Sequence, residues 1–96
     1  MLNPYDKSYY ESLEKKTSNL ANLLTRGFSN NERKLLNEFI EAGEFGLALE
    51  TLVAQIIGNR AQVSKSNTKR ILHLYEIMEL DTDPILEPLQ KLTKND

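Results

Sequence analysis

The sequence of 96 residues contains no cysteine and no tryptophan, and it has a single histidine, His73. Without cysteine the chain has no disulfide scaffold, no thiol nucleophile and no thiolate ligand for a metal. His73 has no second imidazole with which to share a metal and no evident partner for acid–base catalysis. We interpret it as a surface or boundary residue of a helix.

The signature motifs of common enzymes are also missing. No glycine-rich phosphate loop precedes a helix, and neither H-E-x-x-H, G-x-S-x-G nor an acidic calcium-binding loop occurs. The sequence therefore predicts a protein that is not an enzyme and that has no catalytic residue, no cofactor and no metal. A weaker hypothesis, in which His73 works with a carboxylate, stays open.

Long apolar runs are missing as well. Unbroken apolar stretches reach only a few residues, as at Val53 and Ala54, whereas a membrane-spanning helix needs about 20. The first residues contain no apolar stretch of the length found in signal peptides. We expect a soluble, cytoplasmic protein that does not bind membranes.

The composition instead favours helices. Hydrophobic residues make up 40% of the chain, leucine dominates them, and only four Tyr and three Phe occur. A sequence rich in leucine and poor in β-branched residues favours helix, and no window alternates apolar and polar residues with the period of a strand. We predict one all-α domain over residues 1–96, a compact bundle of four helices plus a short C-terminal helix.

The clearest local signals surround Gly43, where we predict the turn of a helical hairpin. Ser29 and Glu32 have the spacing of a capping box, which begins a helix. Gly43 follows that helix and can supply the left-handed residue that closes it. The apolar stripe of this helix is expected to be Leu35, Leu36, Phe39 and Ile40.

The second helix of the hairpin is predicted over residues 44–57, with Gly58 and Asn59 ending it. Glycine inside a helix costs roughly 1 kcal/mol relative to alanine. We therefore expect Gly46 to permit the close approach of another backbone. The inward residues follow the helical period: Phe45, Leu49, Leu52, Val53 and Ile56.

Capping residues and glycine bound the first and fourth helices. Asn3 and Pro4 predict the start of a helix that ends before Gly27, and the polar residues 15–19 suggest fraying in its middle. Either Ser64 or Ser66 caps the fourth helix, which is expected to end near residues 80–81 and to be buried on two sides. Its apolar residues are Ile71, Leu72, Leu74, Tyr75, Ile77 and Met78.

A fifth, short helix is predicted over residues 84–92. Asp83 and Pro84 form its cap and its first residue, and Pro88 would disturb it because proline removes a hydrogen-bond donor. Ile85, Leu86, Leu89 and Leu92 are expected to point inward. Residues 93–96 are predicted to be a frayed tail.

The net charge of −2 is distributed in blocks: residues 29–58 and 76–96 are acidic, and residues 59–75 are basic. The basic residues of the segment 60–70 suggest an alternative function, a small helical regulator that binds nucleic acid. That segment lacks interleaved aromatic residues, and Glu44 and Glu50 on the helix after the turn would repel phosphate. We therefore expect no direct contact with nucleic acid. The basic residues are Arg60, Lys65, Lys69 and Arg70.

The segment around Gly43, EFIEAGEFGLALETL at residues 38–52, resembles a run in small bacterial immunity proteins of the MafI type and of contact-dependent inhibition systems. In that family a helix ends in an F-I-(D/E)-x-(G/N)-E-(F/Y)-G-L-A-L-E-x-L run. The similarity covers about residues 28–57, and the segments on either side add little to it.

The resemblance implies a cytoplasmic protein that binds and neutralises a cognate toxin, the C-terminal domain of a secreted effector and in many such systems a nuclease. A nuclease cleft attracts polyanions, so a cationic toxin would attract an acidic partner. The motif places four glutamates as candidates for toxin binding: Glu38, Glu41, Glu44 and Glu50. These side chains either contact the toxin or hold the hairpin together by capping and local pairing. In the same way, Glu38, Glu41 and Glu44 form either an acidic patch or an ordinary solvated face.

Overall fold

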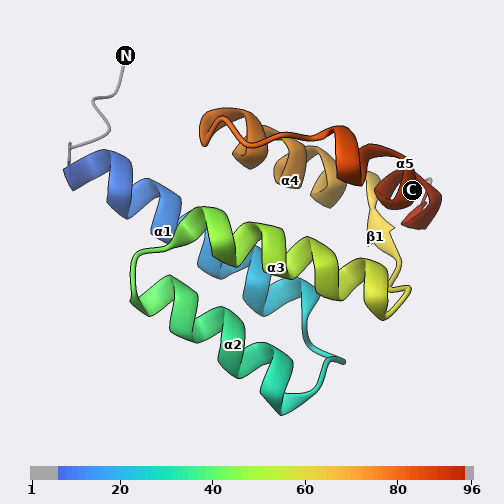
Figure 1. Ribbon diagram of the computed structural model, residues 1–96, viewed down its shortest axis with the longest axis horizontal. Helices are drawn as coiled ribbons and strands as arrows, with labels where there is room; N and C mark the ends of the chain where they lie inside the picture. Colours follow the sequence, from blue (N-terminus) through green and yellow to red (C-terminus); the bar gives the residue numbers. More distant parts are fainter. Residues whose placement is uncertain (1–6, 95–96) are drawn as a thin grey trace.

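The computed structural model describes residues 7–94, and within them it contains five helices and two very short strands. This confirms the all-α class, and Figure 1 shows the arrangement. The predicted cap at Asn3 and Pro4 lies outside the described residues. The elements are α1 (Lys7–Leu24), α2 (Asn30–Glu41), α3 (Phe45–Gly58), β1 (Val63–Ser64), α4 (Lys65–Ile77), α5 (Asp83–Leu92) and β2 (Thr93–Lys94).

Helix α3 is the centre of the bundle. It packs against α1, α2, α4 and α5, and Figure 1 shows it between α2 on one side and α4 on the other, with α1 behind. Four of its apolar residues, Leu49, Leu52, Val53 and Ile56, are 0% exposed, as is Ile71 of α4. None of the helices formed by residues 7–94 is long and apolar enough to cross a membrane.

The hairpin between α2 and α3 forms as its sequence predicts. Ser29 caps α2, and the reciprocal hydrogen bonds of a capping box join it to Glu32. Gly43 has φ +74° and closes α2 in a Schellman motif. In this motif the N–H of Gly43 donates to Ile40 (3.0 Å) and the N–H of Glu44 donates to Phe39 (2.9 Å).

Three details of the first three helices differ from the sequence prediction. Leu35 does not join the buried stripe of α2 but is 42% exposed, whereas Leu36 is 1% exposed. No backbone approaches Gly46; a Cβ there would meet only the side chain of Leu80, at an ordinary 3.7 Å. Helix α1 is continuous from Lys7 to Leu24 and shows no break in its polar middle.

The C-terminal third decides one alternative and adds two corrections. Ser64, one of the two predicted candidates, caps α4. Helix α4 ends at Ile77 rather than near residues 80–81, and α5 begins one residue early with Thr82 at its cap position. Helix α5 continues through Pro88. Its inward residues include Leu89, which is 1% exposed.

Residues 93–94 are not a frayed tail, because they pair with residues 63–64 as a short parallel sheet. Residues 95–96 of the predicted tail lie outside the described residues. The side chain of Thr93 explains this ordered end. Its hydroxyl contacts that of Thr68 at 2.8 Å and donates to the carbonyl of Leu89 at 2.8 Å, which ties the end of α5 to α4.

Candidate interaction surface

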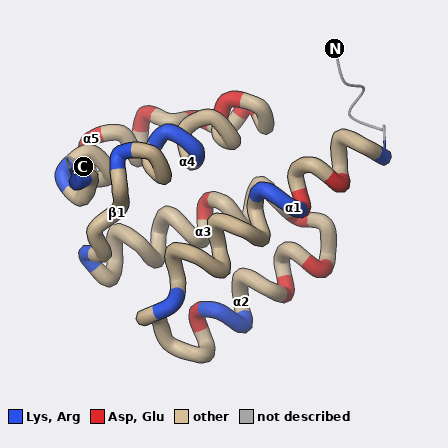
Figure 2. The backbone as a smooth tube through the Cα atoms, turned by 180° about the vertical axis from the view of Figure 1, so that it is seen from behind, with Lys and Arg blue, Asp and Glu red and all other residues tan. Residues whose placement is uncertain are grey.

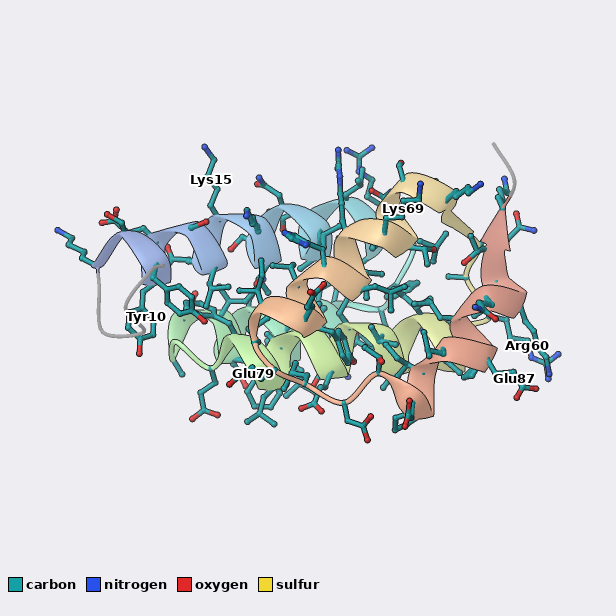
Figure 3. The ribbon with its side chains drawn as sticks, turned by 90° about the horizontal axis from the view of Figure 1, so that it is seen from above. Tyr10, Lys15, Arg60, Lys69, Glu79 and Glu87 are labelled. Carbon is teal, nitrogen blue, oxygen red and sulfur yellow. The ribbon has the colours of Figure 1, made fainter. Side chains whose placement is uncertain are left out.

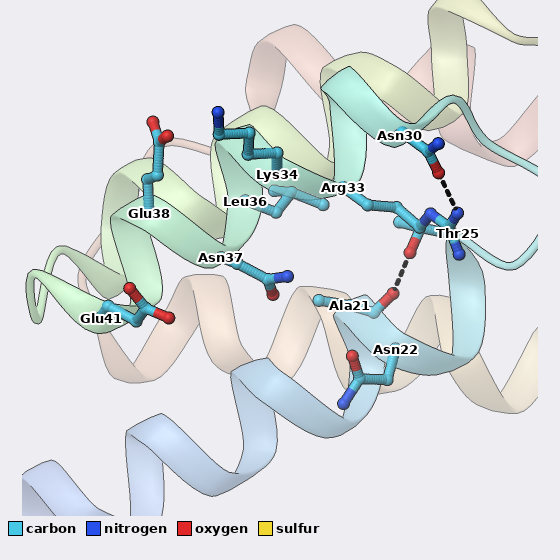
Figure 4. Close-up of a pocket in the computed structure, with 10 residues that line it drawn as sticks. All are labelled: Ala21, Asn22, Thr25, Asn30, Arg33, Lys34, Leu36, Asn37, Glu38 and Glu41. Atoms are coloured by element: carbon cyan, nitrogen blue, oxygen red, sulfur yellow. Dashed lines mark hydrogen bonds between the residues drawn. The ribbon is translucent and has the colours of Figure 1, made fainter.

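A polar groove of about 580 Å³ runs between α1 and α2. Figure 4 shows its lining side chains, which come from the end of α1, from Thr25 just after it and from one face of α2. Ala21 and Leu36 supply its buried floor. The other lining residues are Asn22, Thr25, Asn30, Arg33, Lys34, Asn37, Glu38 and Glu41.

Opposite charges occupy the two ends of this groove. Near the start of α2, the guanidinium of Arg33 donates to the side-chain oxygen of Asn30 at 2.6 Å. Near its end, Glu38 and Glu41 are exposed and form no ion pair with any residue between 7 and 94. Figure 2 shows the same separation along α2, basic near the loop that follows α1 and acidic near the Gly43 turn. The acidic end is therefore open to a cationic partner.

The four predicted glutamates do not form one patch. Glu38 and Glu41 lie together in the groove, and Glu44 is exposed at the cap position of α3 without a capping hydrogen bond from its side chain. Glu50 lies on the edge of α3 that faces α4. There its charge adds to the effect of burial on Tyr75, and the two causes together raise the pKa of this phenol to about 12. The hairpin thus separates Glu50 from the other glutamates.

Glu32, which the motif did not single out as a binding residue, has a structural role in the hairpin. Asn59 donates to Glu32 Oε2 at 2.8 Å, and Gln55 donates to the backbone carbonyl of Glu32 at 3.0 Å. These contacts join the start of α2 to the end of α3. They fasten the open end of the hairpin, away from the Gly43 turn.

A second, more apolar cleft of about 370 Å³ lies between α1 and α4. Lys16, Arg70 and His73 line it together with Leu23, and no acidic residue does. Lys15 of α1 and Lys69 of α4 lie on the same side of the molecule (Figure 3). His73 is thus exposed at the edge of a basic cleft, which agrees with its interpretation as a boundary residue.

Polar or charged side chains of neighbouring helices line both clefts. Among residues 7–94, no group of three or more His, Asp or Glu side chains is placed to hold a metal ion. The sequence signals for the α1–α2 groove were weak, because its asparagines occur singly along two helices and converge only when α1 packs on α2.

The fold and these surfaces define a small all-α protein with an acidic end on its central hairpin. Comparisons with protein-family models, curated proteins and solved structures gave no match to this chain.

Proposed function

We propose that this chain is an immunity protein, which binds a cognate toxin domain in the cytoplasm and neutralises it by forming a stoichiometric complex. The observation that supports this most directly is the pair Glu38 and Glu41. Both are exposed, neither is paired with a described residue, and both belong to the run that resembles the immunity proteins. The toxin that fits them is a cationic domain, for which a nuclease is the natural candidate.

The rigidity of the hairpin adds a physical argument. Stable inhibition needs a surface that loses little conformational freedom when it binds. The Schellman turn at Gly43 and the clamp between Glu32 and Asn59 fix the backbone on which the two carboxylates lie. Because the carboxylates of the acidic end are already in place before binding, their attraction for a cationic toxin speeds association.

Co-expression with the toxin domain encoded by the neighbouring gene tests this proposal. We expect the native chain to protect cells from that toxin. The double variant Glu38→Gln, Glu41→Gln should protect less, with the deficit growing as toxin expression is raised. The matched control Glu14→Gln, Glu76→Gln removes the same charge from exposed positions outside the groove and should protect fully. Equal killing with and without the native chain contradicts the proposal.

One observation favours a second candidate function, that of a regulator that binds nucleic acid. Arg70 of the basic segment lies across the α1–α4 cleft from Lys16, so two helices contribute cations to one site. Binding through phosphates would weaken steeply as salt is added. The absence of any shift of DNA or RNA at low salt eliminates this candidate.

A further inference from the structure

The α2–α3 hairpin has a second face, beside the groove, that exposes apolar side chains. Leu35 of α2 is 42% exposed and Leu47 of α3 is 47% exposed. They are two of the four large hydrophobic residues that the described part of the chain leaves open to solvent. Figure 1 shows α2 and α3 side by side, with α1 behind them.

The position of Leu35 on α2 follows from the contacts of its neighbours. Arg33, Asn37 and Glu41 line the groove toward α1, and Leu36 points into the core. Successive residues turn by about 100° around a helix. Leu35 therefore lies on the edge of α2 that faces α3.

The position of Leu47 on α3 is fixed in the same way. Gln55 donates to the carbonyl of Glu32, which marks the side of α3 toward α2. Gly46 lies beside Leu80, which marks the side toward α4 and α5. By the same rotation, Leu47 lies about 80° from Gln55 and about 100° from Gly46, on the exposed face of α3 between these two sides, in one row with Ala54, which is exposed.

Because α2 and α3 pack side by side, these exposed side chains lie on one outer surface of the hairpin. Because Glu32 lies opposite Gln55 in an antiparallel hairpin, Leu35 is level with Leu52, and Phe39 is level with Ala48. Leu35 and Leu47 are then about five residues, roughly 7.5 Å, apart along the hairpin. We call this surface the hairpin strip. It consists of Leu35, Phe39, Leu47, Thr51 and Ala54.

Carboxylates border the hairpin strip on both sides. Residues three apart are neighbours on a helix surface. Glu38 therefore adjoins Leu35 on α2, and Glu50 adjoins Leu47 on α3. No lysine or arginine is a member of the strip or of this border. The arrangement is an apolar centre with a polar rim, as in protein–protein interfaces, and the charge of the rim is negative.

We propose that the hairpin strip is the centre of the interface with the toxin. It receives an apolar side chain of the toxin that is flanked by lysine or arginine, and these cations pair with Glu38 and Glu50. This assignment rests on the proposed function, and it gives Glu50 a role on the border of the strip that lies across from Glu38. The apolar centre slows dissociation, and the acidic rim speeds association.

Rate measurements with the purified toxin domain test the assignment. Leu35→Ser and Leu47→Ser should each weaken binding by about 10-fold or more, mainly through faster dissociation. Leu23→Ser is the matched control, because Leu23 is 39% exposed on α1 and lies in the α1–α4 cleft. This control should bind as the native chain does.

A further variant distinguishes a loss of binding from a loss of folding. Ala54→Lys retains a good helix former at an exposed position but puts a cation into the strip, so it should also weaken binding. Thermal melts of all four variants should match that of the native chain closely enough to exclude unfolding at the temperature of the assay. If the native chain binds and the strip variants bind equally well, the strip assignment is wrong. If the native chain does not bind at all, the proposed function is wrong.

Discussion

The side-chain amide of Asn59 donates a hydrogen bond of 2.8 Å to Glu32 Oε2, across 27 residues of sequence. The other carboxylate oxygen of Glu32 accepts from the backbone N–H of Ser29 at 3.1 Å. One glutamate therefore both caps α2 and joins it to the end of α3. These hydrogen bonds, with that to Asn59 the largest contribution, hold the pKa of Glu32 below its ordinary value of 4.5.

The lowered pKa of Glu32 predicts a loss of stability in acid. A carboxyl group whose pKa is lower in the folded state stabilises the fold above its unfolded pKa, and this contribution disappears as the pH falls through the folded pKa. Glu32→Gln keeps a hydrogen-bonding side chain but does not titrate. The unfolding free energy of the native chain minus that of Glu32→Gln should therefore fall between pH 6 and pH 3, as measured by urea denaturation.

The matched control for this experiment is Asn59→Ala, which removes the largest cause of the pKa shift. In that background, the effect of Glu32→Gln should depend less on pH. A difference that stays constant from pH 6 to pH 3 in the native background would show that the contact with Asn59 does not form in solution.

Gly43 and Gly46 should respond to alanine in opposite directions. A left-handed conformation costs a residue other than glycine about 1–2 kcal/mol. Gly43→Ala, at φ +74°, should therefore lower the unfolding free energy by about that amount. Gly46→Ala gains helix propensity and an ordinary contact with Leu80, so it should raise stability by up to about 1 kcal/mol. Thermal or urea unfolding measures both changes, and a destabilised Gly46→Ala would contradict the packing described for α3.

The pKa of Tyr75 depends on the charge of Glu50 nearby. Burial is the main cause that raises the pKa of this phenol to about 12, and the negative charge of Glu50 adds to it. Glu50→Gln should lower the pKa of Tyr75, whereas Glu38→Gln should leave it unchanged because Glu38 lies in the α1–α2 groove. Titration of the phenolate absorbance measures the pKa of Tyr75, and Tyr75→Phe identifies which transition belongs to it. Equal shifts from both variants would be inconsistent with the separation of the two glutamates.

The raised pKa of Tyr75 also leads us to expect a loss of stability in alkali. Because its pKa is raised in the folded state, Tyr75 contributes stability that is complete below its ordinary value of 10.0 and is lost as the pH rises through about 12. Tyr75→Phe should show a smaller loss over this interval in urea denaturation. A loss as large as that of the native chain would assign the alkaline transition to other groups.

Local signals allowed much of the hairpin to be predicted from the sequence. The capping box at Ser29 and the left-handed Gly43 act within a few residues, so their chemistry is visible in the sequence. The pairing of residues 63–64 with residues 93–94 was missed for the opposite reason. Two paired residues produce no alternation, and the hydroxyl contact of Thr68 with Thr93 joins distant segments.

The candidate surfaces were predictable only in part. The motif indicated Glu38 and Glu41, and the structure brings them together in one groove. Spacing alone assigned Leu35 to the core, because a helical period shows which residues share a face but does not show how wide the buried face is. The width is set by where α1 and α3 pack on α2, and this packing leaves Leu35 exposed.

The most direct measurement of the central claim is the activity of the purified toxin domain titrated with this chain. If the chain is an immunity protein, toxin activity should fall linearly and vanish near an equimolar ratio. The double variant Glu38→Gln, Glu41→Gln should need an excess to reach the same inhibition. Full toxin activity in a large excess of the native chain would contradict the account.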